Sequence, residues 1–572
     1  MTFIPSGEKI IEKKICQLSG KEFIITDKDI EFYDKVSPVF GGKKYSIPSP
    51  ALCPDERQKR RLAFRNERKL YKRKCDKTGQ EIISIYSPDK SYTVYDQKVW
   101  WGDDWNACEY GVKFDFEKGF FEQFDTLLHA APRINLINKG HENSEFCNFA
   151  TQNNNSYLLF TSGWCENSYF SNRALSTKNV CDSSNITHSE LCYEVIDSSE
   201  CYNCKWVQNS HHCSDCFYWY ALTGCSNCIG CYGLINKQFC IGNKQFDKET
   251  FHKKAPEILA SLSQNKFQKH LQSCTRKYAN IANGENSTWD ALRNVKNVHF
   301  WFESEKLENC KYIYNVTESK DSYDINNDDH SELGYEVVGW ESNYQETFSD
   351  ISWFNSAVSY SSLCFHSKNL FGCSSLKNAH HCIFNTSYSV VEYEKLCWQI
   401  IDHMRSAGEW WEFFSHEFSP FWYNETVAQE YFPMTEEEVK TKGWNWYEGE
   451  NKNTYIWNHY TPLPIREYDE RIVGNTVAQK NIDEILAGII QCELTGKPFK
   501  IIKQELAFYI ENWIPIPTKH PDQRYQERMN LRNPRELYER ACSECEKYII
   551  TTYASERPEK VLCEECYHKL VH

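Results

Sequence analysis

The sequence lacks the features that mark membrane-spanning, exported and uniformly basic proteins. It contains no run of about 18 apolar residues, so no transmembrane helix is expected. The N-terminal MTFIPSGEKIIEKK has no apolar signal-peptide core, and we therefore expect an intracellular, cytoplasmic protein without a membrane partner. Basic residues are outnumbered by acidic ones, 65 against 79, and the formal net charge is −14. This balance excludes a uniformly basic nucleic-acid coat but is compatible with a local basic patch.

Methionine is also scarce, at 4 of 572 residues, whereas cysteine and aromatic residues are plentiful. Aromatic residues make up 15% of the chain, more than a disordered protein carries, and the length allows several domains. The 27 cysteines would indicate disulfides in an exported protein, but no export signal supports that interpretation. Their positions are therefore more informative than their number.

A twelve-residue period runs through residues 139–246 and again through residues 296–388. In the first array the recurring position reads Ser144, Ser156, Ser168, Val180, Cys192, Cys204, Cys216, Cys228 and Cys240. An amide or acid often precedes it, at Asn143, Asn155, Asn167, Asn179, Asn203, Asp215 and Asn227. In the second array the same step links Val298, Cys310, Ser322, Gly334, Glu346, Val358, Leu370 and Cys382, with weaker agreement in residue type.

A fixed short period indicates stacked repeats, and β-branched and aromatic residues favour strands. Asn tolerates the left-handed backbone conformation that the corner of a coil requires. We therefore predict a mainly β protein, a parallel β-solenoid with twelve-residue repeats in two arrays. The period is compatible with a coil of twelve residues and with a coil of twenty-four that contains two such units.

The first array contains C-x-x-C pairs, such as Cys201 with Cys204 and Cys213 with Cys216. Such pairs could be metal or redox sites. The alternative is a ladder of reduced, buried thiols that act as small apolar residues. Ser, Thr, Asn and Val replace Cys at equivalent positions, which a set of metal ligands would not tolerate. This substitution pattern favours the buried ladder.

Each array runs into a segment with helical character. Asp247 is a plausible N-cap for the helix that follows the first array, and Ser389 with Glu392 forms a capping-box pattern after the second. The ends of a solenoid expose unpaired strand edges that need a cover. We therefore expect these two helices to cap the arrays.

The C-terminal segment carries the strongest chemical signal. Cys542 and Cys545 are followed after seventeen residues by Cys563 and Cys566, and two such C-x-x-C knuckles can hold one tetrahedral ion. Four thiolates favour Zn²⁺, although iron is compatible, and they leave no open coordination position, so the site is predicted to be structural. Incomplete versions of the knuckle, which are more plausibly relics than ligands, begin at Cys16, Cys75 and Cys492.

Two matched basic segments, which begin at Cys53 and at His520, lie between the ribbons of each pair. They share the pattern R-N-x-R-x-L-Y-x-R. An Arg-rich segment in an acidic protein is typical of a site for nucleic acid or the ribosome, because guanidinium groups match phosphate oxygens. The alternative is that these arginines pair with carboxylates of the same chain and pack the ribbons on the solenoid. The candidate nucleic-acid-binding residues are Arg57, Arg60, Arg61, Arg65, Arg68, Arg73, Arg532 and Arg535.

These pieces together resemble a group of Cys-rich proteins with zinc ribbons and solenoid repeats, common in bacteria of the candidate phyla radiation. Similar sequences occur in some large DNA viruses. The stretches that carry the resemblance include CPDERQKRRLAFRNERKLYKRKC, LINKQFCIGNKQFDKETF and SPFWYNETVAQEYFPMTEEEV. The resemblance implies ribbon units at both termini but no particular activity, and a viral source would imply a place in the virion.

We divide the chain into seven parts and expect a non-enzymatic scaffold or binding protein. One alternative is a virion or assembly protein that associates with itself or with other assembly proteins. The other is a carbohydrate-active β-solenoid enzyme, which would need paired carboxylates in a cleft. The parts are a degenerate ribbon pair with a basic helix (10–110), a connecting helix (111–138), array 1 (139–246), a helical cap and connector (247–290), array 2 (296–388), a second cap with the SPFWYNET segment (389–485) and a ribbon pair whose last ribbon is intact (486–572).

Overall fold

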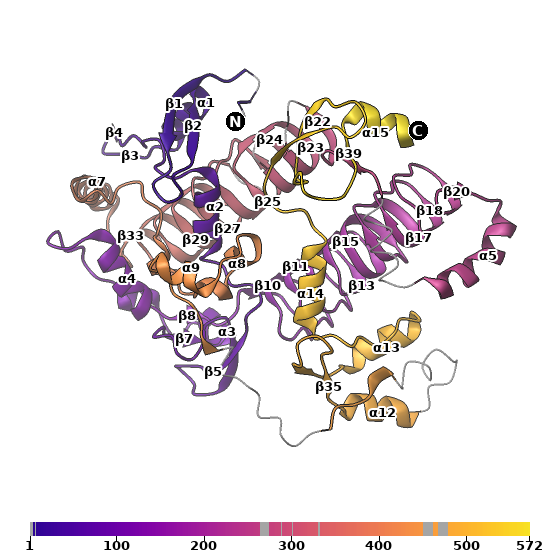
Figure 1. The fold of residues 1–572 in the computed structure, drawn as a ribbon. Coiled ribbons are helices and arrows are strands. Elements are labelled where there is room, and N and C mark those ends of the chain that lie inside the picture. The colour runs from indigo at the N-terminus through magenta and orange to yellow at the C-terminus, as the bar shows by residue number, and fades with distance from the viewer. Residues whose placement is uncertain are drawn as a thin grey trace.

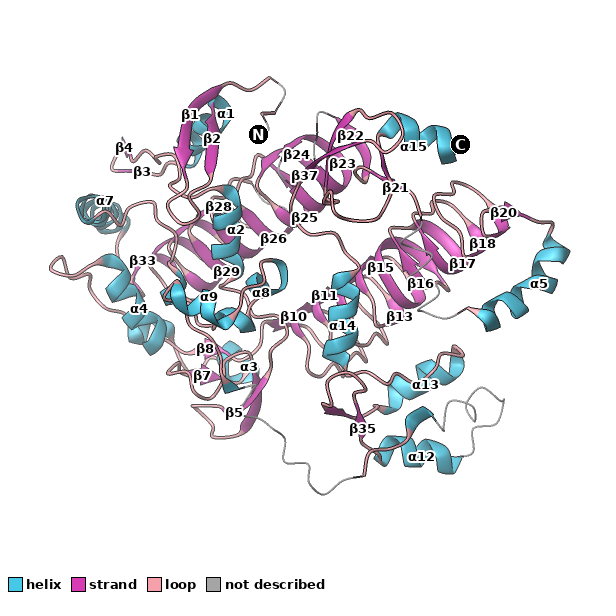
Figure 2. Cartoon of the chain, viewed as in Figure 1, coloured by secondary structure: helices cyan, strands magenta, loops and turns pink. Residues whose placement is uncertain are grey.

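The computed structural model describes residues 4–571 except 6, 263–273, 286, 288, 300, 330–331, 450–460 and 467–478. Two parallel β-solenoids form the body of the protein, as predicted (Figure 1). Array 1 extends from β9 (Asn138–Lys139) to β19 (Gln238–Ile241), and array 2 extends from β22 (Ile281–Glu285) to β33 (His380–Ile383). Helices and ribbons lie around these two rods (Figure 2).

Short parallel strands build both rods. Those of array 1 are β10 (Asn148–Thr151), β11 (Phe160–Gly163), β12 (Asn172–Leu175), β13 (Lys178–Cys181), β14 (Ser184–Thr187), β15 (Glu190–Tyr202), β16 (Lys205–Gln208), β17 (His211–Tyr220) and β18 (Ser226–Ile229). Those of array 2 are β23 (Trp289–His299), β24 (Trp301–Lys311), β25 (Tyr314–Lys320), β26 (Ile325–Asp329), β27 (Val337–Glu341), β28 (Tyr344–Thr347), β29 (Ser349–Trp353), β30 (Ser356–Ser359), β31 (Ser362–Phe365) and β32 (Lys368–Phe371).

The strand register shows how long one coil is. Cys216 pairs with Cys228, and Cys228 pairs with Cys240, each time in parallel. Because parallel pairs join residues twelve positions apart in both arrays, with eleven between β22 and β23, a coil contains twelve residues rather than twenty-four. Positive φ angles recur at every third residue over long stretches, for example 49° at Asn155 and 52° at Leu158, so each coil turns at four corners.

The Asn positions do occupy left-handed corners, as expected, but many other residue types occupy the remaining corners. Thr161 and Trp164 have φ angles of 50° and 53°, although a β-branched or bulky residue pays a steric cost there. The backbone hydrogen bonds from coil to coil hold these corners in place, such as the one from Trp164 N to Thr151 O at 3.0 Å. The stacking of the coils therefore holds these residues in a left-handed backbone conformation that is unfavourable for them in isolation.

The cysteine ladder fills the interior of array 1. Its members are almost fully buried, and their thiols donate to main-chain carbonyls nine residues later, as from Cys201 Sγ to Ser210 O at 3.6 Å. Burial raises the pKa of several of these thiols, to about 12 for Cys147. Among the described residues, no ladder cysteine belongs to a cluster of three or more potential metal ligands. Array 1 thus has a core of cysteines packed with aliphatic side chains.

A helix follows each array, and both predicted N-caps are confirmed. Asp247 accepts a hydrogen bond from the backbone of Thr250 at the start of α5 (Lys248–Ser261). Ser389 and Glu392 form the capping box of α7 (Val390–Ala407). The last parallel strands are covered by β20 (Lys244–Gln245) and β34 (Thr386–Ser387), which pair with them in the antiparallel sense.

Four short β-hairpins make up the ribbons, two toward each end of the chain, which confirms the predicted units. In each one a cysteine N–H donates to the carbonyl five residues later, with N···O distances between 2.8 and 2.9 Å for Cys16, Cys75, Cys492 and Cys542. The hairpins are β1–β2 (Ile10–Ile15 and Glu22–Thr26), β5–β6 (Tyr71–Lys74 and Glu81–Ser84), β35–β36 (Ile490–Gln491 and Pro498–Phe499) and β37–β38 (Tyr538–Ala541 and Tyr548–Thr551).

The ribbon pairs dock on the solenoids in crossed order. The helix between the N-terminal ribbons, α2 (Pro54–Leu62), lies on array 2, whereas the helix between the C-terminal ribbons, α14 (Pro521–Asn530), lies on array 1 (Figure 1). The other helices are α1 (Asp27–Val36), α3 (Gln97–Trp101), α4 (Phe120–Ala130), α8 (Val427–Tyr431), α9 (Glu436–Thr441), α12 (Gln479–Ala487), α13 (Lys503–Glu511) and α15 (Glu564–Val571).

Candidate metal centre and inter-solenoid groove

The four C-terminal cysteines converge on one point in the fourth ribbon. The knuckle between β37 and β38 carries Cys542 and Cys545, and the segment from β39 (Val561–Leu562) into α15 carries Cys563 and Cys566. Their sulfur atoms all lie within 4.8 Å of one another. Among the described residues this is the one group of three or more Cys, His, Asp or Glu side chains with that geometry.

The donor set fits a tetrahedral metal ion. The Cys545 and Cys563 sulfurs are 3.7 Å apart. A tetrahedral ion with metal–sulfur bonds of about 2.3 Å would separate two ligands by about 3.8 Å. Burial opposes ionisation of Cys542, but backbone N–H groups of Cys545 and Cys563 donate to its sulfur and lower its pKa to about 6. A thiolate is therefore available at neutral pH, which metal binding requires.

This centre lies beside the segment that connects the two arrays. β39 pairs in parallel with β21 (Arg276–Lys277), and the Arg276 N–H donates to Lys560 O at 2.8 Å. Lys277 Nζ lies 2.8 Å from a Glu564 oxygen of α15. Because four thiolates would complete the coordination of the ion, the centre can stabilise this junction but offers no position for a substrate.

The three incomplete ribbons keep the hairpin without the ligands. The Asp96 N–H donates to the sulfur of Cys75 at 3.3 Å, in the same way as the Cys563 N–H donates to Cys542. In the first ribbon Ser19 Oγ lies 3.7 Å from the sulfur of Cys53. Hydrogen bonds thus replace coordination in these units, and none of them brings together three described ligands.

The predicted basic face is not exposed. None of the eight candidate arginines has more than 13% of its side chain accessible to solvent. On α2, Arg57 and Arg61 both bind Asp324 of array 2, with N···O distances of 2.8 to 3.0 Å. Arg60 binds Glu336 at 2.5 Å. The alternative stated above is therefore the correct one for α2, because buried guanidinium groups need carboxylate partners.

The C-terminal helix repeats this arrangement on array 1. Arg524 and Arg528 of α14 both bind Asp182, the latter at 3.0 Å. These two arginines are the counterparts of Arg57 and Arg61 in the matched segments. Arg532, which follows the helix, pairs with Asp197 at 2.8 Å. The same i, i+4 pair of arginines thus clamps one aspartate in each solenoid.

The remaining candidate arginines also contact the protein itself. Arg65 lies over Phe149, Arg68 lies over Tyr525 and Arg535 lies over Tyr431, with guanidinium-to-centroid distances between 3.5 and 3.8 Å. Arg73 donates to Asp76 at 3.1 Å. The exposed basic face expected of these eight residues is therefore wrong, because all eight side chains are largely buried against the protein itself.

A groove lies between the two arrays, with a volume of about 640 Å³. Array 1 contributes a row at the same position of successive coils, and array 2 faces it with polar and apolar residues. Five of the described lining residues are Lys or Arg and only Asp197 is acidic. The row of array 1 consists of Lys139, Thr151, Gly163, Leu175, Thr187, Ser199, His211, Thr223 and Ile235.

Two cations in the groove have no carboxylate partner among the described residues. Arg293 of array 2 reaches across to array 1 and donates to Ser199 Oγ at 3.2 Å. Lys139 lies 4.8 Å from the ring centroid of Phe354. Ser199 Oγ is also 2.9 Å from Nδ1 of His211, whose pKa is lowered to about 3 by burial and by Arg293. His211 is therefore neutral, and the charge of this wall comes from Arg293 and Lys139.

The groove does not supply the carboxylate pair that a glycosidase needs. Its single described lining carboxylate, Asp197, is occupied by Arg532, and Asp324 is buried under α2. The Ser199–His211 contact joins equivalent positions of adjacent coils, as the bond from Asn203 to Asp215 also does, and the low pKa makes His211 a weak base. Asp324 belongs with Asp321, Asp328, Asp329 and His330 to an acidic cluster of the sequence, and the side chains of residues 328–330 lie outside the described ones.

Comparisons add no assignment to this geometry. No protein-family model matches the chain, and no curated protein matches it either. The resemblance noted from the sequence motifs therefore stays a prediction. Within the described part of the chain, no helix is both long and apolar enough to cross a membrane.

Sequence reasoning missed the groove, because its walls come from coils that are far apart in the chain. One signal was present. With a coil of twelve residues, the run Thr151, Thr187, Ser199 and Thr223 falls on one face of array 1 and forms a row of hydroxyl groups. No comparable pattern marks Arg293, whose role depends on how array 2 is placed against array 1.

Proposed function

We propose that the protein is a non-enzymatic binding scaffold that holds an extended polyanion in the inter-solenoid groove. The observation that carries this proposal is a local inversion of charge. The whole chain has 65 basic and 79 acidic residues, but the described groove lining has five basic and one acidic. A concave surface of one sign raises the local concentration of ligands of the opposite sign. Nucleic acid stays a candidate partner, bound in the groove rather than on an exposed basic face.

The shape of the groove supports a linear ligand. Lys139 and Ile235 occupy equivalent positions eight coils apart, which is about 38 Å at a strand spacing of roughly 4.8 Å. Trp164, which is 51% exposed, and Trp353 line the same groove and offer flat surfaces for stacking. A long groove with spaced cations, hydroxyl groups and aromatic rings suits a polymer better than a compact metabolite.

The metal centre has a separate, structural part in this proposal. We infer that it binds one Zn²⁺, because four soft thiolates in a closed tetrahedral set are typical of structural zinc. Its part is to hold the fourth ribbon against the connector between the arrays. Metal analysis of the purified protein should find about one zinc per chain, and a chain that binds none when folded would contradict this inference.

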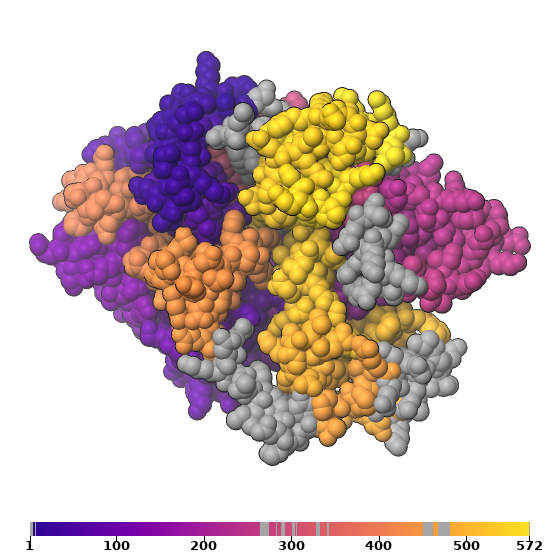
Figure 3. Space-filling view, viewed as in Figure 1, coloured from indigo at the N-terminus to yellow at the C-terminus, as the bar shows by residue number. Residues whose placement is uncertain are grey.

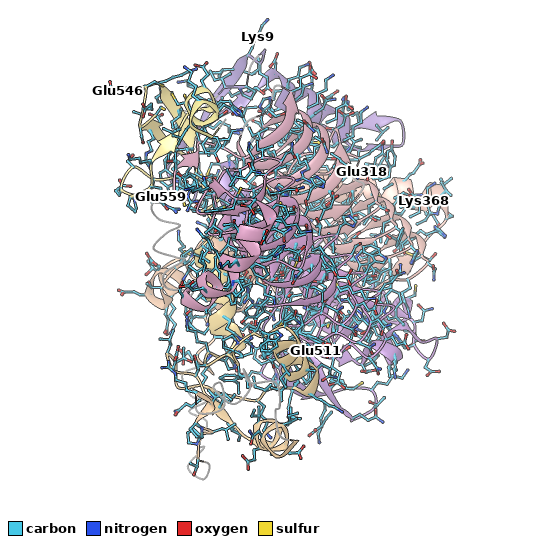
Figure 4. The ribbon with its side chains drawn as sticks, turned by 90° about the vertical axis from the view of Figure 1, so that its right-hand side faces the viewer. Lys9, Glu318, Lys368, Glu511, Glu546 and Glu559 are labelled. Carbon is cyan, nitrogen blue, oxygen red and sulfur yellow. The ribbon has the colours of Figure 1, made fainter. Side chains whose placement is uncertain are left out.

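Binding measurements test the groove. Fluorescence anisotropy with a single-stranded RNA of about 12 nucleotides and with a sulfated oligosaccharide should show binding that weakens steeply between about 50 and 200 mM salt. Reversing the charge of Arg293 and Lys139 together, as R293E with K139E, should lower the affinity at least about ten-fold. A control is Lys368→Glu on the outer face of array 2, at the edge opposite the fourth ribbon (Figure 4). Failure of both probes to bind, or equal effects of control and groove variants, would overturn the proposal.

A further inference from the structure

A second, smaller pocket adjoins the groove where array 1, the connector and the fourth ribbon meet. Its volume is about 50 Å³, several times the space that one water molecule needs. It shares three lining residues with the groove, so the two cavities lie next to each other. The shared residues are Asp197, Asn209 and Asn280.

Three arginines from three different elements line this pocket. Arg276 comes from β21, Arg532 follows α14, and Arg557 lies between β38 and β39 in the fourth ribbon. Side-chain amides and tyrosine hydroxyl groups complete the wall. The described lining residues therefore offer many hydrogen-bond donors, and Asp197 is the single carboxylate among them. This composition is typical of a site that binds an anion.

The arginines are held in position before any ligand arrives. The Arg276 guanidinium stacks 3.6 Å from the ring centroid of Tyr220 and is almost fully buried. Arg557 donates to Asn533 Oδ1 at 3.0 Å and pairs with Glu559 at 2.5 Å. Little side-chain entropy would therefore be lost when a ligand binds to these arginines, which favours binding.

We propose that this arginine pocket, formed by Arg276, Arg532 and Arg557, binds a backbone phosphodiester of a single-stranded nucleic acid that lies in the groove. This inference rests on the proposed function and names its ligand. Guanidinium groups match the geometry of phosphate oxygens, and the aromatic rings of the groove can stack on unpaired bases. A sulfated glycan could also bind the cations, but it has no bases to stack on Trp164 and Trp353.

The test compares a pocket variant with a matched surface variant in the full-length protein. Arg557 is the most accessible of the three, at 34%, and Arg557→Gln removes its charge with the least risk to folding. The control is Arg405→Gln on α7, which removes the charge of an exposed arginine that does not line the pocket. The probes are the single-stranded RNA, the same sequence with an uncharged methylphosphonate backbone, and the sulfated oligosaccharide. Thermal melting and metal content of each variant verify that the fourth ribbon is intact.

We expect R557Q to weaken RNA binding about ten-fold and to reduce the dependence on salt by about one counterion. Binding of the sulfated oligosaccharide should stay within about two-fold of the unmodified protein. Unchanged RNA affinity and salt dependence in R557Q would overturn the pocket, and so would tight binding of the methylphosphonate analogue. If the glycan binds and RNA does not, this inference fails while the proposed function stands. If neither binds, both fail.

Discussion

The two ends of the chain pack on the two solenoids in nearly the same way. The N-terminal ribbon pair places α2 on array 2, and the C-terminal pair places α14 on array 1. In both cases two arginines one helical turn apart bind one buried aspartate, Asp324 or Asp182. The repetition shows that the arginines are part of the packing between helix and rod.

The two junctions differ in what else surrounds the aspartate. Around Asp324 the second carboxylate, Glu336, is bound by a third arginine, Arg60. Around Asp182, Glu505 and Glu194 approach the same two arginines that hold the aspartate. The C-terminal pair also has the four-cysteine centre, which the N-terminal pair lacks. Asp324 is thus the one carboxylate that Arg57 and Arg61 both bind, whereas Arg524 and Arg528 have further carboxylates within 4.0 Å and the C-terminal pair has the four-cysteine cluster.

Loss of the metal should produce the largest difference between the two ends. Cys563→Ser, or a strong chelator, should unfold the fourth ribbon, because a structural zinc site contributes on the order of 10 kcal/mol to folding. Hydrogen exchange should rise throughout residues 538–571. Cys492→Ser in the third ribbon is the matched control and should leave exchange in the ribbons nearly unchanged. Equal effects of the two substitutions would show that the fourth ribbon does not depend on metal.

Removal of the aspartate from the N-terminal junction should have the next largest effect. Asp324→Ala leaves Arg57 and Arg61 buried without a carboxylate, and breaking a buried ion pair in this way costs about 3–5 kcal/mol. The midpoint of chemical denaturation measures the loss. Glu318→Ala, an exposed residue of array 2 labelled in Figure 4, should change stability by less than about 0.5 kcal/mol. A small effect of D324A would mean that water reaches these arginines.

The equivalent change at the C-terminal junction should cost less. In Asp182→Ala, Glu505 and Glu194 remain next to Arg524 and Arg528 and can take over part of the pairing. We expect a loss of about 2–3 kcal/mol, by the same measurement. The test is which of the two variants loses more stability. If D182A is more destabilising than D324A, Glu505 and Glu194 do not take over the pairing with the arginines.

The further carboxylates at the C-terminal junction should also make stability depend on pH, with a smaller effect. Burial raises the pKa of Glu505 to about 7 from its ordinary value of 4.5. Since the folded state holds this proton more tightly, its contribution is complete below pH 4.5 and is lost as pH rises through 7. The free energy of unfolding should therefore fall by on the order of 2 kcal/mol between about pH 5 and pH 8. Glu505→Gln should flatten this slope, and an unaltered slope would assign it to other groups.

The sequence predicted the rods because a twelve-residue period forces equivalent residues to stack whatever the details of a corner. It also predicted the four-cysteine cluster, since ligand spacing within a knuckle is set by local backbone geometry. It did not predict the burial of Arg57 or Arg528, because their partners lie hundreds of residues away. A trace of this pairing is nevertheless visible: Asp182 and Asp324 each lie two residues after the recurring position of their array.

The cysteines of the rod and those of the fourth ribbon show why composition alone was ambiguous. Both sets contain C-x-x-C, but Cys201 and Cys204 are buried in a stack where the twelve-residue repeat alone sets their neighbours. Cys542 and Cys545 instead lie in a tight turn that meets a second knuckle. The pattern of substitution within the repeat separated these two cases, whereas the groove required the placement of two arrays that no local signal encodes.

The crossed docking has a consequence for a ribosome that makes this chain from one end. Asp324 is synthesised 267 residues after Arg57, and Arg524 follows Asp182 by 342 residues. Throughout that interval the nascent N-terminal helix carries charges without their partners, and the first rod has one side uncovered. A prematurely released product would retain these defects permanently.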